Sequence, residues 1–296
     1  MYPILSVPPR PHPPRDYQDF LDGLDQWAIR ISPPDAYRAD EWEFGLPYIP
    51  EARGAGGYSR LRQNGGSKIL IRATETMAVH HFLNGSKPDR DTVRSIFVHL
   101  HEVIHCIAQH WSPVADRGSV RQADDNLEEG AADWLAVRLF PHLIRALGFD
   151  HHTVIALESL FHQHQGACVR SFYADGLVHL LRVTDPVGTQ DPVKLVWHWT
   201  REDLSPNERF ERIARTVSRA RGGNFDMLPA FLRARVITAV HAYCGAMALD
   251  PILSPAERSR ALDAKIARLC RAVDRVHDGM LARLLRFLTS LRSRLP

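Results

Sequence analysis

The chain has 296 residues, enough for one large domain or two modest ones, and 45% of them are apolar, as in an ordinary globular protein with a sizeable core. The formal net charge of +3 is small, so the composition gives no reason to expect a nucleic-acid partner. The cysteines form no Cys-x-x-Cys pair and lie in apolar neighbourhoods, which predicts buried free thiols rather than disulfides: Cys106, Cys168, Cys244 and Cys270.

The N-terminal segment, Met1 to Arg15, is rich in proline. Its apolar run is too short for a secretory signal or a membrane span. We therefore expect a cytoplasmic protein that carries an extended, polyproline-like arm. The alternative is that this arm is a recognition element, or the export signal of a specialised secretion system that delivers the protein as an effector.

The residues after the arm predict one helix and one strand. Asp16 to Arg30 has its apolar residues on one side and predicts a short helix, whereas Ser32 to Gly57 is rich in Pro, Gly and aromatic residues and predicts irregular structure. Lys68 to Arg72 follows turn residues and is the best strand pattern in the chain. In the segment after this strand, His80 and His81 are predicted to be surface side chains.

One His-Glu-x-x-His motif, His101, Glu102 and His105, lies within Phe97 to His110. Its flanks have apolar residues at helical spacing and no Gly or Pro, which predicts a helix with an apolar face. Residues four apart share one helix face with Cβ atoms about 5–6 Å apart, which suits two imidazoles on one zinc ion. Glu102 lies about 100° round the helix, where it is badly placed as a ligand but can serve as general base toward a bound water. His99 lies about 200° from His101 and cannot chelate with it.

A second pair of carboxylates follows in Asn126 to Asp133. Glu129 and Asp133 are four residues apart, so a second helix would present both on one face. Glu129 could complete a His-His-Glu site with one position left for water, and Asp133 could accept the free N–H of one histidine and so fix its tautomer. Glu128 is the rival ligand, but Ala132 rather than a carboxylate stands four residues after it.

The boundaries of this second helix follow from its composition. Trp111 to Asp124 is polar and predicts a connection between the motif helices, so the helix that carries Glu129 is expected to start near Asp124 or Asp125. Pro141 has no backbone N–H to donate, and we expect the helix to bend there.

The two motifs resemble the gluzincin branch of the zincin metallopeptidases, in which a Glu and an Asp four residues later follow the His-Glu-x-x-His helix. The match covers roughly residues 67 to 147. The resemblance implies peptide-bond hydrolysis with one Zn²⁺, a protein or peptide substrate, and a small sheet whose edge pairs with an extended substrate strand. It also implies a donor for the tetrahedral oxyanion, for which Tyr173 and His179 are the candidates, against the alternative that both are packing residues. Gly130 and Ala131 would let the two motif helices approach closely.

Two narrower resemblances lie within the broad one. The order of Gly-rich loop, strand, metal helix and Glu helix is similar to intracellular metallopeptidases of mobile elements and stress responses, which cleave a repressor partner. The Asn-Leu-Glu-Glu run is similar to bacterial toxin and effector zinc proteases, which cut host proteins. The spacing of 24 residues between His105 and Glu129 does not choose between them.

The second half of the chain predicts helices and no further strong strand. Helical patterns cover residues 151–165, 168–182 and 192–200, with a turn-rich break at 184–191. Two later helices share one start signal, a Ser cap followed by Pro and by Glu three residues after the cap: Ser205-Pro-Asn-Glu208 and Ser254-Pro-Ala-Glu257.

The last segment is amphipathic and basic. Its apolar residues keep helical spacing from Leu262 to Leu291, with Asp278-Gly279 as a place where the helix could break, and from residue 251 on ten basic residues stand against four acidic ones. Such a helix can bind acidic partners, nucleic acid or a membrane surface. Its apolar stripe is broad enough to need burial, so we predict a core helix with a solvated Arg face.

Together these patterns predict an α+β but predominantly helical fold, with a zincin-like catalytic core and a small sheet followed by a helical C-terminal half. The expected domains are a Pro-rich arm and N-terminal extension (1–50), a zincin-like catalytic domain (51–185) and a helical C-terminal domain (186–296). The expected activity is that of a zinc-dependent metallopeptidase with Glu102 as general base. The alternative is a non-catalytic protein-interaction module in which zinc is a structural clamp on the same fold.

Overall fold

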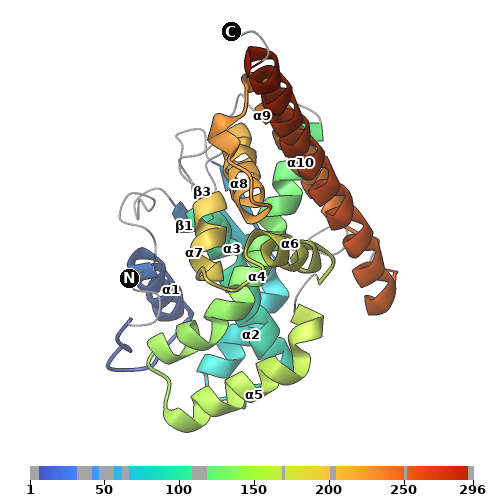
Figure 1. The fold of residues 1–296 in the computed structure, drawn as a ribbon. Coiled ribbons are helices and arrows are strands. Elements are labelled where there is room, and N and C mark those ends of the chain that lie inside the picture. The colour runs from blue at the N-terminus through green and yellow to red at the C-terminus, as the bar shows by residue number, and fades with distance from the viewer. Residues whose placement is uncertain are drawn as a thin grey trace. The chain divides into compact units, whose positions relative to one another are not determined.

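The computed structural model describes residues 7–31, 42–46, 57–61, 67–108, 119–168, 171–200, 205–249 and 252–292. In these ranges the protein is predominantly helical, as the sequence predicts, with a small three-stranded sheet (Figure 1). None of the helices described there combines the length and the apolar character needed to cross a membrane.

The helices follow one another along the chain in the order that the colours of Figure 1 trace. Their bounds are α1 (Tyr17–Ile31), α2 (Ala73–Leu83), α3 (Arg90–Ala108), α4 (Ser119–Ala146), α5 (His151–Cys168), α6 (Ser171–Thr184), α7 (Pro192–Trp199), α8 (Pro206–Ala220), the 3₁₀ helix η2 (Phe225–Met227), α9 (Ala230–Met247) and α10 (Pro255–Arg292).

The sheet has the strand order β1-β3-β2. The central strand β3 (Ser67–Ile71) is the predicted strand, and it pairs parallel with β1 (Trp42–Phe44) and antiparallel with β2 (Gly57–Leu61). β1 lies within the stretch 32–57 that was predicted to be irregular, and that prediction is wrong for it, whereas β2 starts at the last residue of that stretch. They are short and carry no clear alternation of their own, so only pairing with β3 makes them strands.

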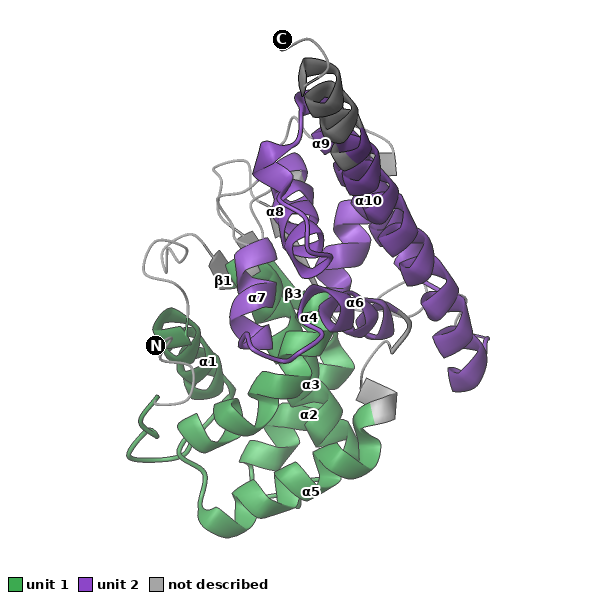
Figure 2. Ribbon diagram, in the orientation of Figure 1, with its two compact units in different colours: residues 1–111, 131–171, 201–203 green, residues 112–130, 172–200, 204–296 purple. Residues whose placement is uncertain are grey.

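The chain forms two compact units, coloured separately in Figure 2. Unit 1 comprises residues 1–111, 131–171 and 201–203, and unit 2 comprises residues 112–130, 172–200 and 204–296. Within unit 1, α3 packs against α1, α2, α5, β2 and β3, and within unit 2, α9 packs against α8 and α10. The uninterrupted helix α4 contributes its first half to unit 2 and its second half to unit 1. The division into three consecutive domains stays a prediction.

Helix α3, which carries the His-Glu-x-x-His motif, is buried on nearly all sides. Its predicted apolar face is confirmed, since five side chains on it are 0–1% exposed: Val93, Ile96, Phe97, Leu100 and Ile104. The motif histidines, Glu102 and His99 are buried as well. Burying polar groups costs free energy unless they find partners. The polar side chains of α3 therefore need either protein partners or a metal ion.

Over residues 7–15 the N-terminal segment packs against the rest of unit 1. The backbone N–H of Arg10 donates to the carbonyl of Ala146 at 2.9 Å, and its guanidinium holds both the backbone oxygen and the carboxylate of Asp19. Arg10 holds the pKa of Asp19 at about 2, well below its usual range. Gly148, with φ +77°, allows the close approach, because a Cβ there would lie 2.5 Å from the Arg10 carbonyl oxygen. Residues 1–6 of the predicted arm lie outside the described residues.

Helix α4 starts earlier than predicted, at Ser119, so the last residues of the expected polar connection are helical. It remains one helix through Pro141, because buried neighbours on the same turn, Phe140, Leu143 and Ile144, hold the chain in place. The two predicted capping boxes are confirmed, at Ser205 with Glu208 and at Ser254 with Glu257.

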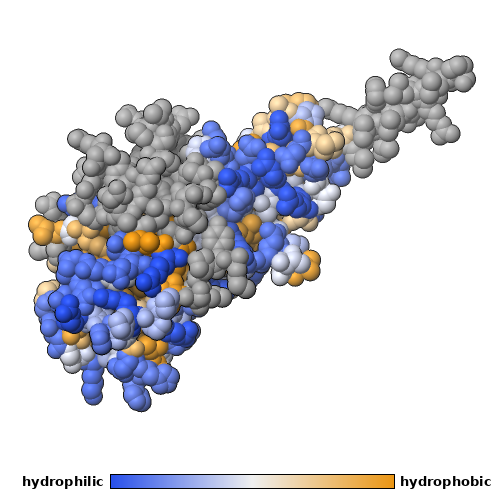
Figure 3. Space-filling model, turned by 90° about the vertical axis from the view of Figure 1, so that its left-hand side faces the viewer, coloured by the Kyte–Doolittle hydropathy of each residue, from blue (hydrophilic) through white to orange (hydrophobic). Residues whose placement is uncertain are grey.

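Helix α10 continues through Asp278-Gly279 without a break. Its first half is a core helix with a solvated Arg face, as predicted. Five apolar side chains on it are less than 9% exposed: Leu262, Ile266, Leu269, Val273 and Val276. Arg260, Arg268, Arg271 and Arg275 are exposed. In the view of Figure 3, hydrophilic side chains cover most of the described surface and apolar ones appear in small groups.

Candidate metal centre

Two imidazoles converge on the buried side of α3. His101 and His105 are 8% and 5% exposed, and their Nε2 atoms lie 2.9 Å apart. Their rings are 4.6 Å apart between centroids and nearly perpendicular. The four-residue spacing produces this arrangement, since it places both side chains on one face of the helix, one turn apart. The pairing predicted from the motif is therefore present.

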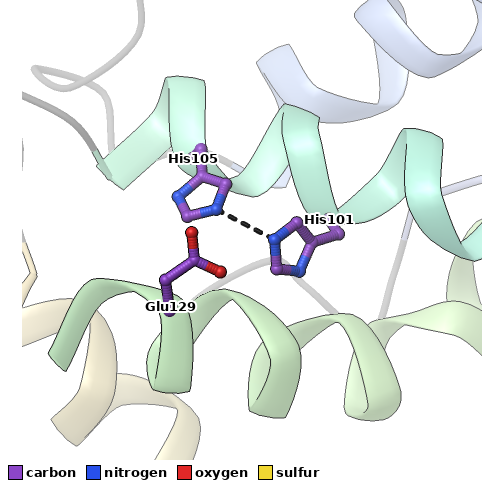
Figure 4. A group of neighbouring side chains, drawn as sticks. All are labelled: His101, His105 and Glu129. Atoms are coloured by element: carbon purple, nitrogen blue, oxygen red, sulfur yellow. Dashed lines mark hydrogen bonds between the residues drawn. The ribbon is translucent and has the colours of Figure 1, made fainter. Parts of the chain in front are cut away.

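Glu129 on α4 joins the two histidines. One ligand atom from each of His101, His105 and Glu129 lies within 4.8 Å of the others. Figure 4 shows the Glu129 carboxylate directed at the imidazoles, which project from α3 toward it. Among the described residues Glu128 is not part of this group, and its Oε2 lies 3.8 Å from Arg209 Nη1 instead. The structure thus brings together the three side chains that the sequence proposed as ligands.

Asp133, one helical turn after Glu129, lies behind His101. Its Oδ1 is 2.9 Å from His101 Nδ1, and its side chain is 2% exposed. The two atoms are close enough for an ion pair, but the direction of the ring N–H does not meet the geometry of a hydrogen bond. The contact still favours a proton on Nδ1, which leaves the lone pair of Nε2 directed at His105 and Glu129.

The donor set fits zinc. Two nitrogens and one carboxylate oxygen match the His-His-Glu ligands of catalytic zinc sites, and two Zn–N bonds of about 2.0–2.1 Å at a tetrahedral angle place their nitrogens about 3.3–3.4 Å apart. The observed 2.9 Å needs a spread of only a few tenths of an ångström. The buried Asp133 also points to a cation here, because its Oδ2 has no hydrogen-bond partner and a buried carboxylate is costly beside a neutral imidazole. A divalent ion held by Nε2 of His101 would supply the missing positive charge.

Glu102 is 5% exposed and follows His101 on α3. Within the described residues it does not belong to the ligand group. This agrees with the helical geometry, which turns it about 100° away from His101. Its role as a general base stays a prediction.

His99 has structural partners of its own in unit 1. Its Nδ1 lies 2.7 Å from the Ser95 carbonyl, which can only accept, so Nδ1 donates and Nε2 accepts from the Tyr17 hydroxyl at 2.8 Å. Burial lowers the pKa of His99 to about 4, so this ring is neutral at pH 7. These contacts account for its burial without a metal, in line with its exclusion as a ligand. His80 and His81 are exposed on α2, as predicted.

The two candidate oxyanion donors lie on α6. Tyr173 is half-buried, and His179 is 7% exposed with its Nδ1 3.2 Å from Asp263 Oδ1 on α10. That carboxylate gives His179 a structural partner within unit 2. Neither residue is a member of the ligand group in the described chain, and their catalytic role stays a prediction.

Gly130, next to Glu129, allows a close approach, but its neighbours are not those expected. A Cβ at this position would lie 3.0 Å from the Tyr173 carbonyl oxygen and 2.8 Å from Met247 Cε. The glycine therefore admits the backbone of α6 and a side chain of α9, rather than α3. The expectation that it lets the two motif helices meet is wrong.

A cavity of about 680 Å³ lies at α2, the loop after it and the first turns of α3. Its lining includes Arg72, Glu75 and Arg94 but none of the three ligand residues. Glu75 is already paired there with Arg94 at 3.3 Å. We assign this cavity no part in the metal centre.

The prediction of buried free thiols is confirmed for Cys106 and Cys244 and is wrong in burial for Cys270. Cys106 and Cys244 are buried free thiols, and Cys270 is a half-buried one. A comparison of the chain with protein-family models, with curated proteins and with solved structures found no match.

Proposed function

We propose that this protein is a zinc-dependent metallopeptidase. The observation that carries the proposal is the convergence of His101, His105 and Glu129, whose ligand atoms lie within 4.8 Å of one another. Three protein ligands, with a fourth position for water or substrate, are the arrangement of catalytic rather than structural zinc sites. Glu102 beside His101 also favours an enzyme, since a structural clamp has no use for a base at that position.

Each residue of the site has a defined task in this proposal. Zinc, when bound, polarises the scissile carbonyl and lowers the pKa of a water molecule toward about 7. Glu102 takes a proton from the attacking water and delivers it to the leaving amine. Asp133 keeps the proton of His101 on Nδ1, so that Nε2 is free to bind. The burial of both histidines keeps bulk water away from them and strengthens these electrostatic interactions.

The small sheet supports a peptide as substrate. Because β3 is the central strand, the free edges of the described sheet belong to β1 and β2. An extended peptide can add to such an edge through main-chain hydrogen bonds, which bind any sequence, while side-chain pockets select among sequences. We therefore expect an extended, unfolded segment of a protein as substrate.

The test replaces Glu102 by Gln, which keeps the size of the side chain but removes its ability to take a proton. We expect Glu102→Gln to fold and to bind zinc like the wild type, and to lose about 10²–10⁴-fold in the rate of the chemical step. The measurement is cleavage of a peptide library, followed by mass spectrometry, with and without a zinc chelator.

The matched control is Glu211→Gln, the same substitution at a half-buried position of α8. It should leave cleavage unchanged. Equal, chelator-sensitive cleavage by the wild type and by Glu102→Gln would falsify Glu102 as the base. Zinc binding without cleavage by any variant would favour the non-catalytic interaction module instead.

A further inference from the structure

Arg209 on α8 is 2% exposed and among the largest fully buried side chains of the described residues. Its Nη1 lies 3.3 and 3.4 Å from the two carboxylate oxygens of Asp124 and 3.8 Å from Glu128 Oε2. Both carboxylates belong to the first half of α4, and all three residues lie in unit 2. Burying a guanidinium and two carboxylates is costly unless they pair, so this contact resists disruption.

The geometry of an α-helix connects this contact to the metal centre. Asp124 and Glu128 are four residues apart and differ by about 40° around the axis, so one guanidinium can hold both. Glu129 is turned about 100° further from Glu128. Because Arg209 holds the carboxylates of Asp124 and Glu128 against α8, the side chain of Glu129 points in another direction.

A second contact restricts the same segment of α4. The Asn126 side chain is buried and donates from Nδ2 to the carbonyls of Cys244 and Gly245 on α9, at 3.1 Å each. Two anchors in different directions, one to α8 and one to α9, leave little freedom for rotation about the helix axis. Burial raises the pKa of Asp124 to about 6 against the opposing effect of Arg209, so the carboxylate is still mainly ionised at pH 7 and the ion pair persists.

We propose that Arg209 is a positioning residue of the metal centre: by holding Asp124 and Glu128, it sets the rotation of α4 so that Glu129, and not the neighbouring Glu128, is the metal ligand. This inference rests on the proposed zinc site and deepens it. Arg209 is not a member of the ligand group among the described residues. Its effect on zinc passes through the helix.

The experiment measures the zinc affinity of the full-length protein by competition with a chromogenic chelator. Arg209→Lys keeps the charge, but the lysine side chain ends one bond short of the position of Nη1, the atom that lies near both carboxylates. Arg212→Lys is the matched control, since Arg212 lies on the same helix and donates to the His198 carbonyl instead. We expect about tenfold weaker zinc binding in Arg209→Lys, the lower end of the effect of outer residues on zinc sites, and no change in Arg212→Lys.

Arg209→Met separates positioning from charge. Removing a positive charge near a cation by itself strengthens zinc binding, so weaker binding in this variant supports the positioning role. Circular dichroism of the metal-free proteins checks that each variant folds. If Arg209→Met does not fold, the comparison of Arg209→Lys with Arg212→Lys tests the inference.

If the wild type binds zinc, two results would overturn this inference without affecting the proposed function. One is equal affinity of Arg209→Lys and wild type, and the other is tighter binding by Arg209→Met. A wild type that binds no zinc overturns the proposed function, and this inference with it.

Discussion

At the scale of single residues, the proposed metal centre consists of three side chains, His101, His105 and Glu129. Replacing His101, His105 or Glu129 by Ala should each lower zinc content below about one ion per chain, because three protein ligands hold the ion. The measurement is metal analysis of the purified variants. His80→Ala, which removes an exposed histidine of α2, should keep the full zinc content. Loss of metal in Glu128→Ala but not in Glu129→Ala would show that the ligand assignment is wrong.

A second prediction separates a histidine that binds metal from one that only packs. Asp133→Asn removes the charge behind His101 and should weaken zinc affinity by about 10–100-fold. Tyr17→Phe removes the hydroxyl that donates to His99 and leaves a buried acceptor unsatisfied, which should lower the free energy of unfolding by about 1–3 kcal/mol. Zinc titration and urea unfolding of both variants give the comparison. A fall in zinc affinity in Tyr17→Phe would contradict the structural role of His99.

At the scale of elements, Gly130 determines how closely α4 packs within unit 2. Gly130→Ala places a Cβ 3.0 Å from a backbone carbonyl of Tyr173, which cannot move aside as a side chain can. We expect a loss of about 1–3 kcal/mol in the free energy of unfolding, as for other overpacked sites. Zinc binding should weaken as well, because the displaced residue follows Glu129 directly.

The matched substitution is Gly279→Ala in α10, where an added Cβ would meet no atom within 4 Å. There the loss of a flexible helical glycine should stabilise the protein by roughly 0.5–1 kcal/mol. Urea unfolding of both variants tests the contrast in sign. Equal effects of the two substitutions would mean that the close approach at Gly130 has no energetic consequence.

At the scale of the whole molecule, zinc should act as a stabiliser, since the ligands come from two helices whose mutual position the unfolded chain does not retain. A ligand that binds only the folded state at 100 times its dissociation constant stabilises by about 2.7 kcal/mol. For a chain of this size that corresponds to a rise in Tm of about 4 °C. Differential scanning calorimetry with zinc, and with a chelator, measures it. Glu129→Ala should abolish the shift, and a zinc effect that survives in this variant would point to a different site.

Several features depend on short stretches of chain, and these could be predicted. The capping boxes at Ser205 and Ser254 involve residues three apart, so the local sequence contains all of their atoms. The side chains of His101 and His105 lie next to each other because the two residues are four positions apart on one helix. The predicted strand at β3 has its own apolar pattern. None of these depends on which distant segment packs nearby.

Other features arise only when distant residues meet. Strands β1 and β2 form by pairing with β3, and the N-terminal segment is held by Arg10 at Ala146, residues far apart in the chain. Gly130 was predicted to admit one helix and admits another. A small residue in a sequence shows that something comes close, but not which segment does.

The choice of ligand shows the same division. The sequence by itself determined the candidate set, two histidines on one turn and two adjacent carboxylates on a later helix, because motif spacing fixes which side chains share a helix face. The sequence also favoured Glu129 over Glu128, because Asp133 stands four residues after it, but only the tertiary structure decided that the Glu129 carboxylate reaches the histidines while Glu128 lies 3.8 Å from Arg209. Helical periodicity determines the angle between two neighbouring side chains, whereas the rotation of the whole helix depends on contacts with residues from distant parts of the chain.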